Sequence, residues 1–275
     1  MIRLWPDREI HAERIKIGKM PAIIVRPKEP SPKAPGVLWI HGGGYIFGMK
    51  EMVYMSRAVD LVKKFGVVVI SPGYRLAFQA PYPAALQDCY RTLLYMKKHA
   101  GELGIDKDRI MVGGESAGGG LCAALCMLAR DKGKVNIAFQ MPLYPMLDNL
   151  DTESSRDNHG KVWNTRRNHF GWRMYLRRGA KKKVSPYASP ARQTNWKGLP
   201  PAYTFVGDGE PFYAETLEYI RCLQEAGIEA KADVYHSNMH AFDMLRPDLQ
   251  ESREAVRKFE EAFAFAAGHY YAKND

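Results

Sequence analysis

Gly113-Gly-Glu-Ser-Ala-Gly-Gly-Gly120 is the stretch that decides the fold. A β-prone run at residues 108–112 precedes it, and residues 121–129 after it favour a helix at nearly every position. Ser116 is therefore predicted at a sharp turn between a strand and a helix. The pattern G-x-S-x-G is weak by itself, but in this setting its glycines make room for a strained turn that raises the serine hydroxyl above the sheet edge.

A second glycine motif follows an earlier strand. The apolar run at residues 36–40 is typical of a strand covered on both faces, and it ends in His41-Gly-Gly-Gly-Tyr45. Consecutive glycines leave backbone amides unshielded, so the amides can approach a ligand oxygen closely. A flexible turn is the plainer interpretation, and a phosphate loop is disfavoured because the G-K-[ST] ending is missing.

Strands and helices alternate along most of the chain, which predicts an α/β fold with a mostly parallel sheet and helices on both faces. We expect one domain over residues 1–275, interrupted at about residues 148–199 by an insertion that serves as a lid. Strands are expected at residues 13–18 and 21–26, both as edge strands, and at 36–40, 67–70, 108–112, 136–144, 202–206 and 230–235. Helices are expected at residues 53–65, 84–99, 121–129, 168–178, 212–226 and 248–267.

Bulk properties favour a cytoplasmic globular protein. The 275 residues contain no run of membrane-spanning length, and the start of the chain is too charged for a signal peptide. The four cysteines have no metal-like spacing, which favours reduced thiols in or near the core. These are Cys89, Cys122, Cys126 and Cys222.

The net charge of +10 is unevenly distributed, because no acidic residue lies between Asp157 and Asp208. Such a run can attract nucleic acid, but no nucleic-acid motif accompanies it, so a solvated basic face is favoured. Its basic residues are Lys161, Arg166, Arg167, Arg173, Arg177, Arg178, Lys181, Lys182, Lys183, Arg192 and Lys197. Trp163, Phe170, Trp172, Tyr175, Tyr187 and Trp196 lie in the same insertion, and we expect most of them to anchor it to the body.

A serine hydroxyl becomes a good nucleophile only when a base takes its proton and a third group orients that base. In this architecture the acid and the histidine follow late strands, in the order serine, acid, histidine. That order leaves His236 and His240 as candidates for the base. His240 is preferred because its loop is long enough for the side chain to return toward Ser116. Glu210 is preferred to Asp208 as the acid for the same reason.

The remaining site residues lie at the same edge of the sheet. The amides of Gly43, Gly44 and Ala117 are the candidate oxyanion hole, each worth on the order of 3 kcal/mol of barrier. Candidate substrate-pocket residues are Tyr45, Phe47, Glu115 and Phe212. The bulky members indicate a short acyl slot, whereas Glu115 is expected to act as a brace behind the serine, and His41 to prop the glycine loop.

These motifs together resemble the hormone-sensitive-lipase-like esterases of the α/β-hydrolase superfamily. The resemblance runs from about residue 36 to the C-terminus and includes Tyr74-Arg-Leu-Ala, Tyr144-Pro-Met-Leu-Asp148, Val184-Ser-Pro-Tyr187 and Leu199-Pro-Pro-Ala202. It implies hydrolysis of small carboxylic esters, including acetylated sugars or alcohols, through an acyl-serine intermediate without metal or cofactor. Three departures are Glu210-Pro211 in place of the family's Asp-Pro, Ala241 in place of glycine after the histidine, and a shortened N-terminal extension.

Three other interpretations stay open at this point. A small peptidase of the same fold usually needs a large gating element, which this chain lacks. A non-hydrolytic ligand-binding relative would not need both Ser116 and His240, and a nucleic-acid-binding protein would bind DNA in a steeply salt-dependent way. The sequence favours a small ester as partner, neither nucleic acid nor membrane, and leaves a homodimer open.

Overall fold

A computed structural model describes residues 9–29, 31–177 and 183–275. The start of the chain, Pro30, and the basic residues Arg178, Lys181 and Lys182 lie outside the described residues. The described strands are β1 (Ile10–Ile17), β2 (Met20–Pro27), β3 (Ala34–Ile40), β4 (Val68–Pro72), β5 (Ile105–Glu115), β6 (Phe139–Leu143), β7 (Ala202–Gly207) and β8 (Ala230–Tyr235). The α-helices are α1 (Arg57–Phe65), α2 (Ala84–Lys98), α3 (Ala100–Leu103), α4 (Ala117–Lys132), α5 (Thr165–Leu176), α6 (Tyr213–Glu225), α7 (Phe242–Leu245) and α8 (Gln250–His269).

The described strands form one eight-stranded sheet in the order β1-β2-β4-β3-β5-β6-β7-β8. The pairs β1–β2 and β2–β4 are antiparallel, and all pairs from β4 to β8 are parallel. The prediction of a mostly parallel α/β sheet is therefore confirmed. The prediction that β2 is an edge strand is wrong, because β2 pairs with β1 on one side and β4 on the other.

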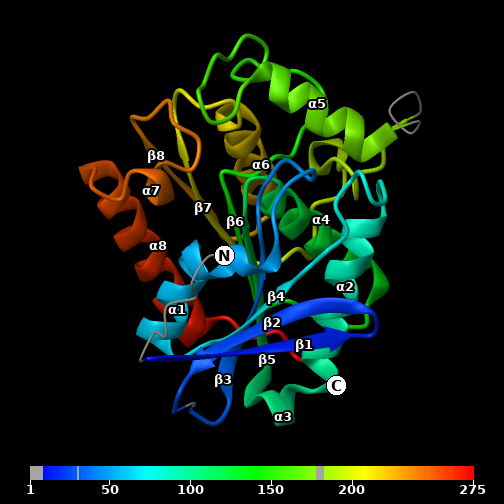
Figure 1. Ribbon diagram of the computed structural model, residues 1–275, viewed down its shortest axis with the longest axis vertical. Coiled ribbons are helices and arrows are strands. Elements are labelled where there is room, and N and C mark those ends of the chain that lie inside the picture. The colour runs from blue at the N-terminus through cyan, green and yellow to red at the C-terminus, as the bar shows by residue number, and fades with distance from the viewer. Residues whose placement is uncertain (1–8, 30, 178–182) are drawn as a thin grey trace.

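Side chains alternate between two apolar layers along the central strands, as a sheet covered on both faces requires. Leu38 and Ile40 of β3 face the layer under α2, α4 and α6, whereas Val37 and Trp39 face the layer under α1 and α8. Figure 1 shows α1 and α8 on one side of the sheet, α2 and α4 on the other, and α5 above the strand ends.

Several helix boundaries differ from the sequence-based expectation. The helix expected at residues 53–65 is divided into a 3₁₀ segment, η1 (Lys50–Met55), and α1, because the Ser56 side chain accepts a hydrogen bond from the Ala58 amide and begins a new helix. Helix α5 begins at Thr165 rather than 168, because the Asn164 side chain caps it through the Arg167 amide at 3.0 Å. A second 3₁₀ segment, η3 (Pro190–Arg192), lies late in the insertion.

Two bulk features of the chain can be compared with the fold. All four cysteines are free thiols, three of them buried, as the sequence predicted. Within the described residues, no helix is both long and apolar enough to span a bilayer.

Candidate active site

Ser116 lies at the sharp turn between β5 and α4. Its φ of 57° and ψ of −120° are unusual for a residue other than glycine, and such strain persists only where the surroundings fix the backbone. Here the Ser116 amide donates to the Leu143 carbonyl at 3.0 Å, while its carbonyl accepts from the Gly120 and Met146 amides. A Cβ on Gly118 would lie 2.0 Å from the Ile40 carbonyl oxygen, so glycine is required for α4 to pack this close to β3.

Ser116, His240 and Glu210 come together from three separate loops. The Nε2 atom of His240 lies 2.9 Å from Ser116 Oγ, and its Nδ1 pairs with Glu210 Oε2. Glu210 is fully buried, and its other oxygen accepts from the Gly207 amide at 3.4 Å. A hydroxyl, an imidazole and a carboxylate are thus arranged in one line of contacts, which is the arrangement that proton removal from a serine requires.

Two buried aromatic rings hold the imidazole of His240. Tyr144 and Phe212 each meet it edge to face, with ring centroids 5.1 Å apart. Sequence reasoning gave Tyr144 no role, although it opens one of the motifs of the resemblance. Phe212, predicted in the substrate pocket, is fully buried at the base of α6 and packs against the histidine.

Asp208 and His236, the two alternatives weighed above, form a separate surface pair. Asp208 accepts from His236 Nδ1 at 2.9 Å and from the Ser237 amide at 3.1 Å. The His236 side chain is 96% exposed, and this contact with Asp208 raises its pKa. Within the described residues, neither group contacts Ser116.

The glycine loop lies beside the serine. A Cβ on Gly42 would be 3.3 Å from Ser116 Cβ, and Gly43 and Gly44 have φ of 110° and 59°. The Gly43 carbonyl accepts from the Ile46 and Phe47 amides. Among the described residues, the amides of Gly43, Gly44 and Ala117 donate to no protein acceptor, so they are available to an oxyanion.

His41 supports this loop from behind. Its ring stacks on Tyr74 at 4.2 Å, and its Nδ1 donates to the Gly42 carbonyl at 2.8 Å. Burial lowers the pKa of His41 to about 4, so the ring is neutral at pH 7. A neutral, buried imidazole fits the bracing role expected from the sequence.

The other predicted pocket residues are placed differently from one another. Tyr45 is buried, stacks on Tyr175 at 4.0 Å and donates its hydroxyl to the Met146 carbonyl, so it anchors the insertion. Phe47 is 64% exposed. Glu115 is buried and accepts a hydrogen bond from Trp39 Nε1 at 2.8 Å, as a brace would. Contact of these residues with a substrate stays a prediction.

The insertion packs directly onto the glycine loop. A Cβ on Gly44 would lie 2.1 Å from the Trp163 ring, and one on Gly171 of α5 would lie 2.9 Å from the Gly44 carbonyl oxygen. Trp163, Trp172 and Tyr175 are buried, whereas Phe170 is 42% exposed. These three aromatic side chains therefore anchor the insertion.

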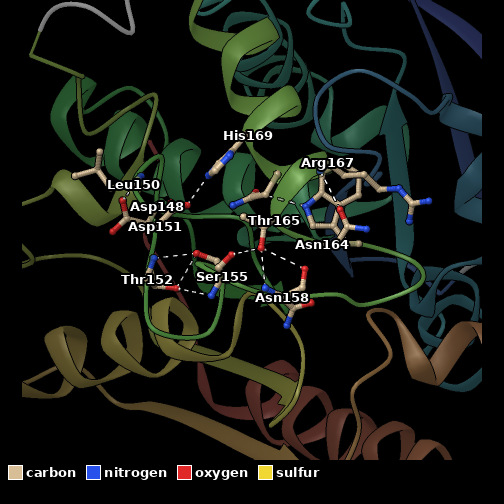
Figure 2. Close-up of polar contacts among 12 residues, drawn as sticks. Asp148, Leu150, Asp151, Thr152, Ser155, Asn158, Asn164, Thr165, Arg167 and His169 are labelled. Atoms are coloured by element: carbon tan, nitrogen blue, oxygen red, sulfur yellow. Dashed lines mark hydrogen bonds and ion pairs between the residues drawn. The ribbon is translucent and has the colours of Figure 1, made fainter.

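Polar contacts join the insertion to the loop that carries Glu210. Ser154 Oγ donates to the Pro211 carbonyl at 2.8 Å and accepts from the Ala214 amide, while Asn158 Nδ2 donates to the Gly209 carbonyl at 3.1 Å. Figure 2 shows polar contacts within the insertion. The Asn158 amide donates to Thr165 Oγ1, and, separately, His169 pairs with Asp151. Sequence reasoning missed these contacts, which join residues more than fifty positions apart and leave no periodic signal.

A buried charged group lies behind the site. Asp243, in α7 just after His240, is fully buried and pairs with Arg57 Nε at 3.4 Å. Burial raises the pKa of Asp243 to about 6 and that of Glu115 to about 8, with Arg57 opposing both shifts. Within the described residues, no group of three His, Cys, Asp or Glu side chains could hold a metal ion.

We expect the variant Glu115→Gln to be more stable than the wild type at high pH. The folded chain holds the Glu115 proton up to about pH 8 and the unfolded chain only to about 4.5, so between these values stability falls as pH rises. A glutamine oxygen still accepts from Trp39 but cannot ionise. Urea unfolding should show that the free energy of unfolding of the variant, relative to that of the wild type, is higher at pH 8 than at pH 5. The exposed Glu153→Gln is the control. An equal difference at both values contradicts the prediction.

Comparisons with known proteins agree with this geometry. Residues 37–244 match a family model described as the alpha/beta hydrolase fold. An arylesterase of Saccharolobus solfataricus is 33% identical over 75% of this chain and 67% of its own length. An ethyl acetate hydrolase of Pseudomonas putida is 27% identical over 86% of this chain and 76% of its own length.

A solved structure, a bacterial heroin esterase, is similar with a TM-score of 0.89 and 32% identity, over 94% of this chain and 85% of that one. The chain therefore belongs to the α/β-hydrolase family, which confirms the resemblance to hormone-sensitive-lipase-like esterases. Family and relatives together support the class of carboxylic ester hydrolase for this chain.

Proposed function

We propose that this protein is a serine carboxylesterase that cleaves small, short-acyl esters through an acyl-serine intermediate. The observation that carries the proposal is the contact chain from Ser116 Oγ through His240 to Glu210, with 2.9 Å between Oγ and Nε2. The candidate substrates are acetyl esters of sugars or alcohols. The name of the Pseudomonas putida relative, an ethyl acetate hydrolase, supports a short acyl group.

In the first half-reaction, His240 Nε2 accepts the proton as Ser116 Oγ attacks the ester carbonyl carbon. The carbonyl oxygen becomes an oxyanion, which the amides of Gly43, Gly44 and Ala117 stabilise at about 3 kcal/mol per donor. Glu210 holds the imidazole in the correct tautomer and stabilises the imidazolium. The imidazolium then gives its proton to the leaving alcohol oxygen, and the carbon–oxygen bond to the alcohol breaks.

In the second half-reaction, water takes the place of the alcohol. His240 removes a proton from this water, the hydroxide attacks the acyl carbon, and the acid leaves as Ser116 regains its proton. Residues 148–199 act as the lid in this scheme. Trp163 covers Gly44, which limits the space beside the oxyanion site and favours a small acyl group.

We expect a panel of 4-nitrophenyl esters to show a preference for short acyl chains. Because extra methylenes overfill a short slot, kcat/KM should be highest for acetate to butyrate and fall by at least about tenfold by octanoate. Initial rates at matched low substrate concentration measure this. A maximum at decanoate would contradict the short slot but leave ester hydrolysis itself intact.

A further inference from the structure

Two adjoining hollows lie along the insertion, and one of them also borders the loops that carry Glu210 and His240. We call them together the lid cleft. The inner one, of about 430 Å³, is lined by residues 157–162 together with Gly209, Asn238 and Met239. The outer one, of about 600 Å³, is lined by residues 157–159 and 164–166 together with His169, Phe170 and Arg173. Because they share three lining residues, they meet at residues 157–159.

The inner hollow borders the loops that carry two of the three triad candidates. Gly209 and Met239 are the chain neighbours of Glu210 and His240, and Val162 precedes Trp163, whose ring packs on Gly44. In ester cleavage the alcohol oxygen takes its proton from the histidine, so the alcohol half lies on the histidine side. An alcohol half that extends past the histidine would therefore approach the inner hollow along the loops of Gly209 and Met239.

The charge of the lid cleft is positive. Lys161, Arg166 and Arg173 line it, and among the described residues none of their charged groups has an acidic partner within 4 Å. Asp157 is the one acidic residue in either lining, and it pairs with His159 at 3.1 Å. The other lining histidine, His169, pairs with Asp151 at 2.6 Å.

We propose that the lid cleft binds an anionic group, a carboxylate or a phosphate, carried by the alcohol half of the substrate ester. This deepens the proposed esterase function and rests on it. Phe170 forms part of the outer lining and offers an apolar surface there. Its ring centroid lies 5.4 Å from the Arg173 guanidinium, which places that positive charge over the ring. Lys161 lines the inner hollow and Arg166 the outer one, so replacing both removes positive charge from each hollow.

The test compares 4-acetoxybenzoate, which carries its charge on the alcohol half, with its neutral methyl ester. In the variant Lys161→Ala/Arg166→Ala, the ratio of kcat/KM for the anionic to the neutral ester should fall about fivefold, since two largely exposed ion pairs are lost. For the wild type this ratio should also fall as salt screens the charges. The control Lys16→Ala/Lys19→Ala removes the same net charge from exposed positions on the β1–β2 hairpin, far from α5 in Figure 1, and should leave the ratio unchanged.

Two further arms separate the outcomes. The first arm uses 4-acetoxyphenyl phosphate in place of 4-acetoxybenzoate, and measures how far Lys161→Ala/Arg166→Ala lowers kcat/KM relative to the neutral ester. A larger decrease for the phosphate than for the carboxylate identifies phosphate as the preferred anion, and a smaller decrease identifies carboxylate. With 4-nitrophenyl hydrogen succinate, whose charge lies on the acyl half, a larger fall than with 4-acetoxybenzoate overturns the placement. An unchanged ratio in Lys161→Ala/Arg166→Ala, or the same fall in the control variant, overturns the proposal.

The failure of the proposed function has a different signature. If the protein hydrolyses neither acetoxybenzoate ester nor 4-nitrophenyl acetate, the esterase proposal fails. The lid cleft is then tested by titrating wild type and Lys161→Ala/Arg166→Ala with the product 4-hydroxybenzoate, followed by NMR. A several-fold higher Kd in the variant supports the anion site, and equal Kd values overturn it.

Discussion

Replacing Ser116 with alanine is expected to lower kcat for 4-nitrophenyl acetate by about 10⁵- to 10⁶-fold. The variant keeps the oxyanion amides and the pocket, but it has no atom that can form the acyl-enzyme. Ser116 is nearly buried, and its hydroxyl contacts His240, so the smaller side chain leaves the backbone turn intact. Initial rates, with an unfolding curve to show that the fold is kept, measure the effect.

Full activity in purified Ser116→Ala would contradict the account, because the reaction would then use another group. The same experiment separates two of the interpretations that the sequence left open. A non-hydrolytic ligand-binding protein shows no turnover in the wild type, whereas a serine esterase loses its turnover only in the variant.

Replacing His240 with alanine is expected to cause the second large loss of kcat, and His236→Ala is the matched control. His240→Ala removes the base that takes the serine proton, so kcat should fall by about 10⁴-fold or more. His236 lies at the surface with Asp208 as its partner, and substitution of such a residue should leave about half of the activity or more.

The same rate assay on both variants, after matched thermal melts, tests this assignment. The reverse pattern, with His236→Ala inactive and His240→Ala active, would exchange the two histidines and contradict the geometry. Equal and moderate losses would show that the loop at residues 236–240 matters only for structure.

Much of the site could be predicted because its signals are local. The turn at Ser116 is set by its own glycines, whose close approaches to the Ile40 carbonyl tolerate no side chain. The parallel sheet places successive strand ends at one edge, so the loops after β3, β5, β7 and β8 had to meet there. Loop length alone then distinguished His240 from His236.

What the sequence could not predict depends on contacts between distant segments. The interior position of β2 follows from pairing on both sides, which its own residues do not encode. Tyr45 and Phe47 are close in sequence, yet one is buried under the insertion and the other is 64% exposed. Ser154 and Asn158 contact the loop of Glu210 only because the chain folds back after more than fifty residues.

Covalent labelling of the wild type with a dialkyl 4-nitrophenyl phosphate tests the central claim most directly. The reagent transfers its dialkyl phosphoryl group to the serine and releases 4-nitrophenolate, and peptide mass spectrometry locates the adduct. The account predicts one phosphoryl adduct, located on Ser116, absent from Ser116→Ala and formed far more slowly in His240→Ala. An adduct on a different residue, or none in a preparation that hydrolyses 4-nitrophenyl acetate, would contradict it.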